Sequence, residues 1–137
     1  MVNMNDMNFV NKISFRSIGE SVKAWLENPS EQVLNSYLNA MEKGEIECLT
    51  LYGPNEERLF IIGKPNFYHV TIFVDESEGY GYNDGTRDSS NIEIAGDYWP
   101  SFRVCKDMRI LKAIAHEFFA SGQPSKSEHW IHFSDEE

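Results

Sequence analysis

Cysteine is scarce in this chain, with only Cys48 and Cys105 among 137 residues. The two cysteines lie far apart and form no Cys-x-x-Cys pair, which excludes a metal cluster built from closely spaced thiolates. One disulfide is possible, but we favour two buried thiols in a reducing compartment, where free cysteine behaves as a small apolar residue.

Basic residues are also few: 12 against 22 acidic residues, a net charge of −10. A protein that binds nucleic acid needs a basic face for the phosphates, and an anionic membrane surface attracts the same charge. The composition therefore argues against both partners and favours a positively charged one. The alternative is that the acidic charge only keeps the protein soluble.

Long apolar runs are absent, and none reaches the ~20 residues of a membrane-spanning helix. The first residues, MVNMNDMNFVNKISF, lack the basic and apolar regions of a signal peptide. We therefore expect a cytoplasmic protein. Its length and aromatic content predict one domain over 1–137, with a loose lead-in at 1–12 and an acidic tail at 134–137.

Two consecutive helices are predicted over residues 17–43. Ser17 to Glu20 has the S-x-x-E form of a capping box, and Asn28-Pro29 ends this first helix. Ser30 can cap the second helix, which Gly44 stops. Apolar residues recur at helical spacing in both: Ile18, Val22, Trp25 and Leu26, then Val33, Leu34, Tyr37, Leu38 and Met41.

Strand patterns follow. Segments 46–52, 58–62 and 67–74 are rich in β-branched and aromatic residues and are joined by short turns, which predicts an antiparallel meander. Further strands are expected around Tyr80 and Tyr82, at 92–95 and at 129–133, and a late helix at 108–121. The predicted fold class is α+β: a central, mostly antiparallel sheet with two N-terminal helices and one late C-terminal helix.

Motifs for catalysis, metals or cofactors are missing from the sequence. His129 and His132 are three apart on a predicted strand, which places them on opposite faces. No EF-hand loop, zinc motif or phosphate-binding loop is present. We therefore predict no catalytic residue, no metal and no cofactor, and a protein that is not an enzyme.

The segment 75–97 is rich in carboxylates, with tyrosines among them. Tyrosine often anchors protein interfaces, so this segment is our candidate contact surface for a basic partner. The candidate residues are Asp75, Glu76, Glu78, Tyr80, Tyr82, Asp84, Asp88, Glu93 and Asp97. A solvated loop is the alternative. Tyr80 and Tyr82 share one strand face and could instead cover the sheet, and Glu56 with Glu57 offers a second patch.

The C-terminal third carries a further pattern: Trp99-Pro100, the run Ala115-His116-Glu117-Phe118-Phe119-Ala120-Ser121-Gly122, and then Trp130. This pattern resembles the first immunity-protein family of bacterial polymorphic toxin systems. The resemblance implies a small α+β domain in which Trp99 and Trp130 are core residues. It also implies that the chain binds and neutralises a toxin's C-terminal domain, such as a nuclease or deaminase, which is delivered by contact-dependent growth inhibition or by a secretion system.

Charge and resemblance together predict an immunity protein whose partner is a cognate toxin domain, most simply a basic nuclease, held by the acidic and aromatic surface. Two alternatives stay open: an adaptor or chaperone for a secreted effector, and a small enzyme without a local motif. The sequence leaves the toxin's reaction and the oligomeric state open.

Overall fold

The computed structural model of the chain describes residues 8–20 and 23–134. Parts of the predicted lead-in and acidic tail, residues 1–7 and 135–137, lie outside the described residues, as does Val22. The elements in chain order are β1 (Lys12–Ser17), β2 (Ala24–Glu27), α1 (Glu31–Glu42), β3 (Ile46–Tyr52), β4 (Arg58–Lys64), β5 (Phe67–Phe73), β6 (Glu78–Asn83), β7 (Asn91–Ile94), β8 (Asp97–Pro100), the short 3₁₀ helix η2 (Ser101–Arg103), β9 (Val104–Cys105), α2 (Met108–Ser121) and β10 (His129–Ser134).

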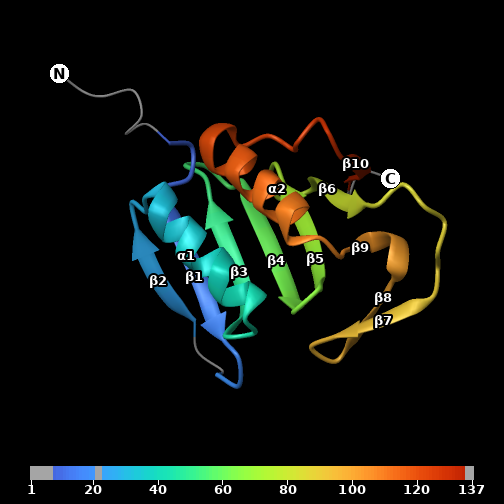
Figure 1. Cartoon of the computed structure of the whole chain (residues 1–137). Helices are drawn as coiled ribbons and strands as arrows, with labels where there is room; N and C mark the ends of the chain where they lie inside the picture. Colours follow the sequence, from blue (N-terminus) through green and yellow to red (C-terminus); the bar gives the residue numbers. More distant parts are fainter. Residues whose placement is uncertain (1–7, 21–22, 135–137) are drawn as a thin grey trace.

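A large antiparallel sheet forms the centre of the protein. Its strands lie in the order β10-β6-β5-β4-β3-β1-β2. One edge of β5 is shared, because β6 pairs with its C-terminal half while β9 pairs with Tyr68 and His69 in its N-terminal half. β7 and β8 form a separate two-stranded sheet, which packs beside β5 through Trp99 of β8 and His69 of β5 (Figure 1).

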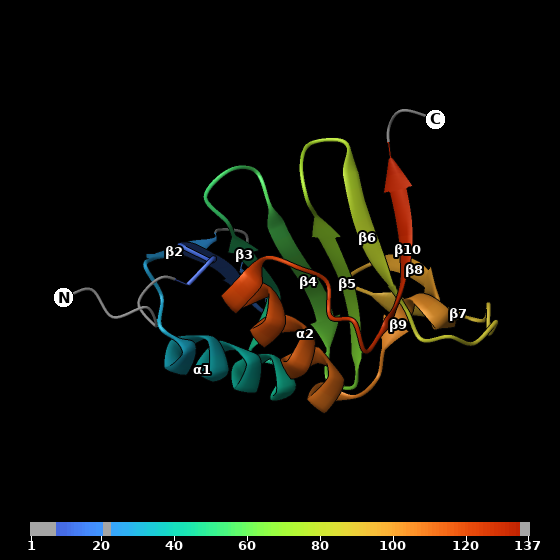
Figure 2. The same cartoon turned by 90° about the horizontal axis from the view of Figure 1, so that it is seen from above.

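Both helices cover the same face of the large sheet (Figures 1 and 2). Because side chains alternate along a strand, each strand sends every second residue toward the helices. The core between sheet and helices includes fully buried Leu49, Leu51, Leu59, Ile61, Val70 and Ile72 from β3, β4 and β5, and Leu34, Leu38, Leu111, Ile114 and Phe118 from the helices.

Side-chain caps fix the ends of both helices. Ser30 accepts a hydrogen bond from the Val33 amide at the start of α1, and Asp107 accepts one from Arg109 at the start of α2. Gly122 ends α2 with φ 74°, a left-handed conformation that glycine adopts without strain. Phe9 packs against both Gly122 and Phe118, so residues just before β1 are tied to the end of α2.

The predicted architecture is wrong in its first helix. Among the described residues one helix precedes β3, namely α1, and a β-hairpin replaces the other: Ile13 of β1 lies opposite Leu26 of β2. Ser17 to Glu20 is a turn, in which the Glu20 amide donates to the Ser17 carbonyl and Gly19 has φ 79°. The helical spacing was coincidental, because Ile18 and Trp25 are 54% and 55% exposed rather than on a buried stripe.

The remaining predicted elements are present. The strands expected at 46–52, 58–62 and 67–74 are β3, β4 and β5, paired as the predicted antiparallel meander. The late helix predicted over 108–121 is α2, and the predicted final strand is β10. Cys48 and Cys105 are buried and free, which confirms the predicted thiols. No described helix is long and apolar enough to cross a membrane.

Candidate functional site

The acidic segment does not form one continuous surface. Asp75 and Glu76 lie in the turn between β5 and β6, at one end of the sheet. Asp84 and Asp88 lie beyond the other end of β6, in the loop that leads to β7. The six residues of β6 separate these two groups by roughly 20 Å, at about 3.3 Å for each residue. Glu93 and Asp97 belong to the β7–β8 hairpin, and Glu78 begins β6.

Several of these carboxylates shape their own turns. Asp75 accepts hydrogen bonds from the amides of Ser77 and Glu78, at 2.8 and 2.9 Å, and these bonds hold its pKa below the ordinary value. Asp88 likewise accepts from the hydroxyl and amide of Ser90, with the same effect on its pKa. One oxygen of each carboxylate is thus committed to the local backbone.

The two tyrosines of the predicted surface point toward the helix-covered face. Tyr82 is 3% exposed and belongs to the core, so it is not on the surface. Tyr80 is half-buried and packs against His132 of β10, whose Nε2 lies 3.1 Å from a carboxylate oxygen of Glu78. The sequence left open whether these tyrosines contact a partner or cover the sheet. Tyr82 covers the sheet.

The second patch lies beside the first part of the acidic segment. The turns that follow β3 and β5 bring Glu56 next to Glu76, and a hydrogen bond between their side chains raises the pKa of Glu56. The negative charges of Glu76 and Asp75 add to this effect. Glu57 instead accepts hydrogen bonds from Asn55 within its own turn. Glu56, Asp75 and Glu76 therefore make one acidic end of the sheet.

Among residues 8–20 and 23–134, the most exposed large hydrophobic side chain is Tyr98, at 69%. It lies directly opposite Glu93 in the β7–β8 hairpin and next to exposed Asp97. Trp99, its neighbour, points the other way and stacks on His69 of β5 at 3.6 Å, so that the indole anchors the hairpin to the sheet. The prediction missed Tyr98 as a site residue, although alternation within Tyr98-Trp99 requires that these rings face opposite sides.

Trp99 and Trp130 differ from each other in their packing. Trp99 is partly buried, with its indole nitrogen enclosed and without a hydrogen-bond partner among the described residues. Trp130 is also partly buried and packs against the main core, and its indole nitrogen donates to the Ser125 carbonyl at 2.8 Å. Both tryptophans therefore serve packing, as their predicted core role requires, and neither is fully enclosed.

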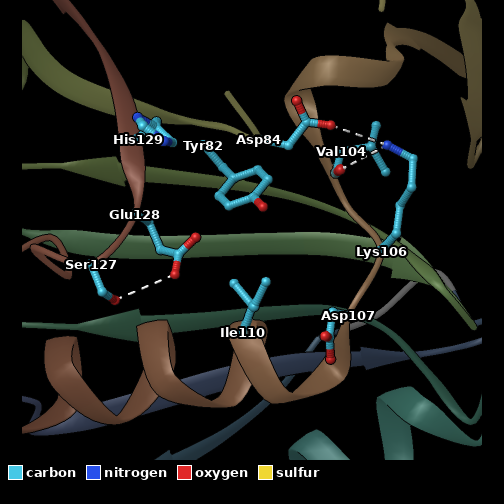
Figure 3. A pocket seen from close by; sticks show the side chains of 9 residues that line it. All are labelled: Tyr82, Asp84, Val104, Lys106, Asp107, Ile110, Ser127, Glu128 and His129. Carbon is cyan, nitrogen blue, oxygen red and sulfur yellow. Dashed lines mark hydrogen bonds and ion pairs between the residues drawn. The ribbon is translucent and has the colours of Figure 1, made fainter. Parts of the chain in front are cut away.

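A pocket of about 380 Å³ opens between β6, the start of α2 and the segment before β10 (Figure 3). Its lining residues are Tyr82, Asp84, Val104, Lys106, Asp107, Ile110, Ser127, Glu128 and His129. Two of these lining residues, Tyr82 and Asp84, belong to the predicted contact surface, and Asp84 is the charged one of the two. Burial would raise the pKa of Asp84, but hydrogen bonds from Thr86 and the nearby Lys106 ammonium hold it below the ordinary value.

Tyr82 lines the pocket, and its side chain interacts with the buried thiol of Cys105. Burial raises the pKa of Tyr82, and the charges of Glu128 and Asp84 add to the effect. Burial also raises the pKa of Cys105 to about 11, although a hydrogen bond from the Tyr82 hydroxyl opposes this shift. Both groups therefore stay protonated at neutral pH, and Cys105 is not an activated nucleophile.

Among the described residues, no group of three or more histidine, cysteine, aspartate and glutamate side chains is placed to hold a metal ion. His129 and His132 lie on opposite faces of β10, because they pair with Asn83 and Tyr80 in an alternating ladder.

No curated protein matches this chain. A crystal structure of a hypothetical protein from Neisseria gonorrhoeae is similar, with a TM-score of 0.68 and 20% identity over 92% of this chain and 96% of that chain. This likeness shows the fold alone. A family model matches residues 8–127, and the chain therefore belongs to DUF6911, a family of unknown function.

Proposed function

We propose that this protein is an immunity protein, which binds and neutralises a cognate toxin domain in the cytoplasm as a single domain without a cofactor. One observation carries the proposal: Tyr98 is exposed on a projecting hairpin and lies beside the carboxylates of Glu93 and Asp97. An exposed tyrosine with acidic neighbours suits a basic protein surface, because the ring supplies packing and the carboxylates supply charge.

The toxin domain is proposed to be a basic nuclease. Such an enzyme presents a positive cleft to the phosphates of its substrate. The net charge of −10 attracts that cleft over a distance and speeds association, which matters when free toxin is lethal. The acidic hairpin and the neighbouring loop with Asp84 and Asp88 would then cover the cleft and exclude the nucleic acid.

A growth-rescue experiment tests the proposal. The C-terminal domain encoded by the reading frame upstream of this gene is induced in a test strain, with this protein or a non-cognate control co-expressed. We expect growth arrest that only this protein relieves. A toxic domain that it fails to relieve would contradict the proposal. Binding without relief of toxicity would favour the adaptor alternative.

A pair of variants locates the contact within the same assay. Tyr98→Ala should weaken protection, because it removes the proposed anchor of the interface. Trp25→Ala is the matched control, since Trp25 is an exposed aromatic residue on β2 at the opposite edge of the sheet. Equal protection by both variants would move the contact surface away from the hairpin even if the protein is an immunity protein.

A further inference from the structure

We propose that the pocket between β6, α2 and the segment before β10 binds one guanidinium or alkylammonium group carried on an aliphatic stem. Its volume of about 380 Å³ lies at the lower end of the range for small-ligand sites, about 300–1,000 Å³. This is enough for a single arginine-like side chain. Nothing in the proposed interface around Tyr98 uses this space.

The pocket combines an apolar floor with carboxylates at its sides. Ile110 and Val104 provide aliphatic surface, and the ring of Tyr82 lies near them among the lining residues (Figure 3). Glu128 reaches in from the segment before β10, and Asp84 and Asp107 lie on the opposite side. Arginine and lysine have the matching distribution, with methylene groups along the stem and the charge at its end.

The carboxylate of Glu128 has the greatest capacity for a new cation. Its hydrogen-bond partner in the described structure is the Ser127 hydroxyl, at 3.3 Å, and it makes no ion pair there. Its charge acts on the hydroxyl of Tyr82, which lines the pocket, and on the buried thiol of Cys105. A guanidinium placed above Tyr82 would therefore meet a half-buried carboxylate that lacks a counter-charge.

Lys106 does not act as the counter-charge of Glu128. Its ammonium donates to the Ser101 and Val104 carbonyls at 2.8 and 3.3 Å and lies 3.5 Å from a carboxylate oxygen of Asp84. These three acceptors hold Lys106 at the side of the pocket away from Glu128 (Figure 3). The same arrangement disfavours an anionic ligand, because Lys106 is already occupied by these acceptors. Of the three carboxylates that line the space, Asp84 pairs with Lys106 and Asp107 pairs with Arg109, whereas Glu128 forms no ion pair among the described residues.

The position of the pocket connects it to the toxin interface. Asp84 lines the pocket and also begins the acidic loop that leads to β7, so a basic partner seated on the loop could insert an arginine here. The assignment of the cation to a protein partner rests on the proposed function. The chemistry of the pocket does not, because a free amine could occupy the same site.

A ligand titration followed by two-dimensional NMR tests the pocket without any toxin. The probes are N-acetyl-arginine amide, which carries the side chain on a peptide backbone, and agmatine, which is a free amine. N-acetyl-citrulline amide is the neutral control of the same shape. We expect saturable shifts around residues 104–107 and 127–129 with the two cations and none with citrulline. Tighter binding of agmatine than of the capped arginine would identify a free amine as the source.

Matched variants decide whether Glu128 is responsible. Glu128→Gln should weaken binding of the cationic probes about tenfold, the usual size for losing a charged hydrogen bond. Glu27→Gln makes the same change in charge on β2, at the opposite edge of the sheet, and should bind like the wild type. Equal binding by all three proteins, equal shifts with citrulline, or shifts with inorganic phosphate instead would overturn the proposal.

The rescue assay then separates the two proposals. If the titration succeeds and Glu128→Gln also loses protection while Glu27→Gln keeps it, the cation belongs to the toxin. If the pocket binds no cation while the wild type still protects, the pocket proposal fails and the immunity function stands. If the pocket binds arginine but the protein relieves no toxicity, the pocket proposal stands and the immunity function fails.

Discussion

His69 is a titratable residue that lies buried on β5. It is 4% exposed and lies between the Trp99 ring, which stacks on it, and Arg103, whose Nη2 is 3.4 Å from the histidine Nε2. A guanidinium can only donate, so Nε2 must accept and the proton of the neutral ring is on Nδ1. A second proton on Nε2 would face Arg103 directly. Burial and this repulsion lower the pKa of His69 to about 4.

The low pKa makes the stability depend on pH. The unfolded chain binds a proton at His69 near pH 6.5 and the folded protein only near pH 4, so the stabilising effect is present at neutral pH and is lost as pH falls through this window. Between these two pH values the free energy of unfolding falls by about 3 kcal/mol. Carboxylates with lowered pKa, such as Asp75 and Asp88, lose their contribution only at pH below 3.8.

Urea unfolding at several pH values between 7 and 4.5 measures this effect. His69→Gln should flatten the curve, whereas His129→Gln, at an exposed position, should keep the wild-type slope. If His69→Gln does not fold, the imidazole of His69 can be followed by NMR in the wild type. A titration midpoint near 6.5 in the folded protein would disprove the lowered pKa.

At the scale of elements, the β1–β2 hairpin forms although the spacing of apolar residues in this segment is helical. Ile13 is fully buried beneath the helices, while Ile18, predicted for a buried helix face, is 54% exposed in the turn after β1. Spacing along the chain can indicate a period, but it cannot show which residues find a partner strand. β1 pairs with β3, which lies about thirty residues later, and such long-range pairing has no local signal.

This difference in burial predicts that the same substitution has a large effect on the free energy of unfolding at Ile13 and a small effect at Ile18. Ile13→Ala should lower the free energy of unfolding by about 2–5 kcal/mol, because it leaves a cavity in the core. Ile18→Ala should change it by less than about 1 kcal/mol, since the side chain is largely in water. Chemical denaturation of both variants measures the two values. A larger loss of unfolding free energy for Ile18→Ala than for Ile13→Ala would contradict the hairpin and support the helix predicted from the sequence.

The meander and α2 were predictable because their signals are local. β3, β4 and β5 are dense in β-branched and aromatic residues, and α2 has both a capping aspartate and a terminal glycine. The candidate surface was less predictable. The sequence shows which residues are acidic, but the division of the segment between two sheet ends and a hairpin depends on how β6 and β7 pair, which only the fold decides.

At the scale of the whole molecule, the acidic charge is distributed in separate groups. One group, Glu56, Asp75 and Glu76, lies at the turn end of β6, and the loop with Asp84 and Asp88 lies at the other end. The separation of roughly 20 Å exceeds the Debye length of about 8 Å at physiological salt. The two ends therefore act on a partner independently once it is close, and only the end that touches it determines the affinity.

This separation predicts which charge reversals slow the association with a toxin domain. Asp97→Lys is the most direct test near Tyr98, because Asp97 is exposed, whereas Asp84 and Asp88 also hold their turns together. The association rate should fall by a factor of roughly two to ten at low salt and approach the wild-type value at high salt, since salt screens the lost attraction. Stopped-flow mixing with the toxin identified by rescue measures both rates.

Glu27→Lys provides the control, with the same change of net charge on exposed β2 at the far edge of the sheet. If net charge alone steers the partner, both reversals slow association equally. If the hairpin is the contact, Asp97→Lys has the larger effect and also raises the dissociation rate, because its lysine meets the basic surface in the complex. An unchanged rate for Asp97→Lys would leave the acidic end formed by Glu56, Asp75 and Glu76 as the surface to reverse next.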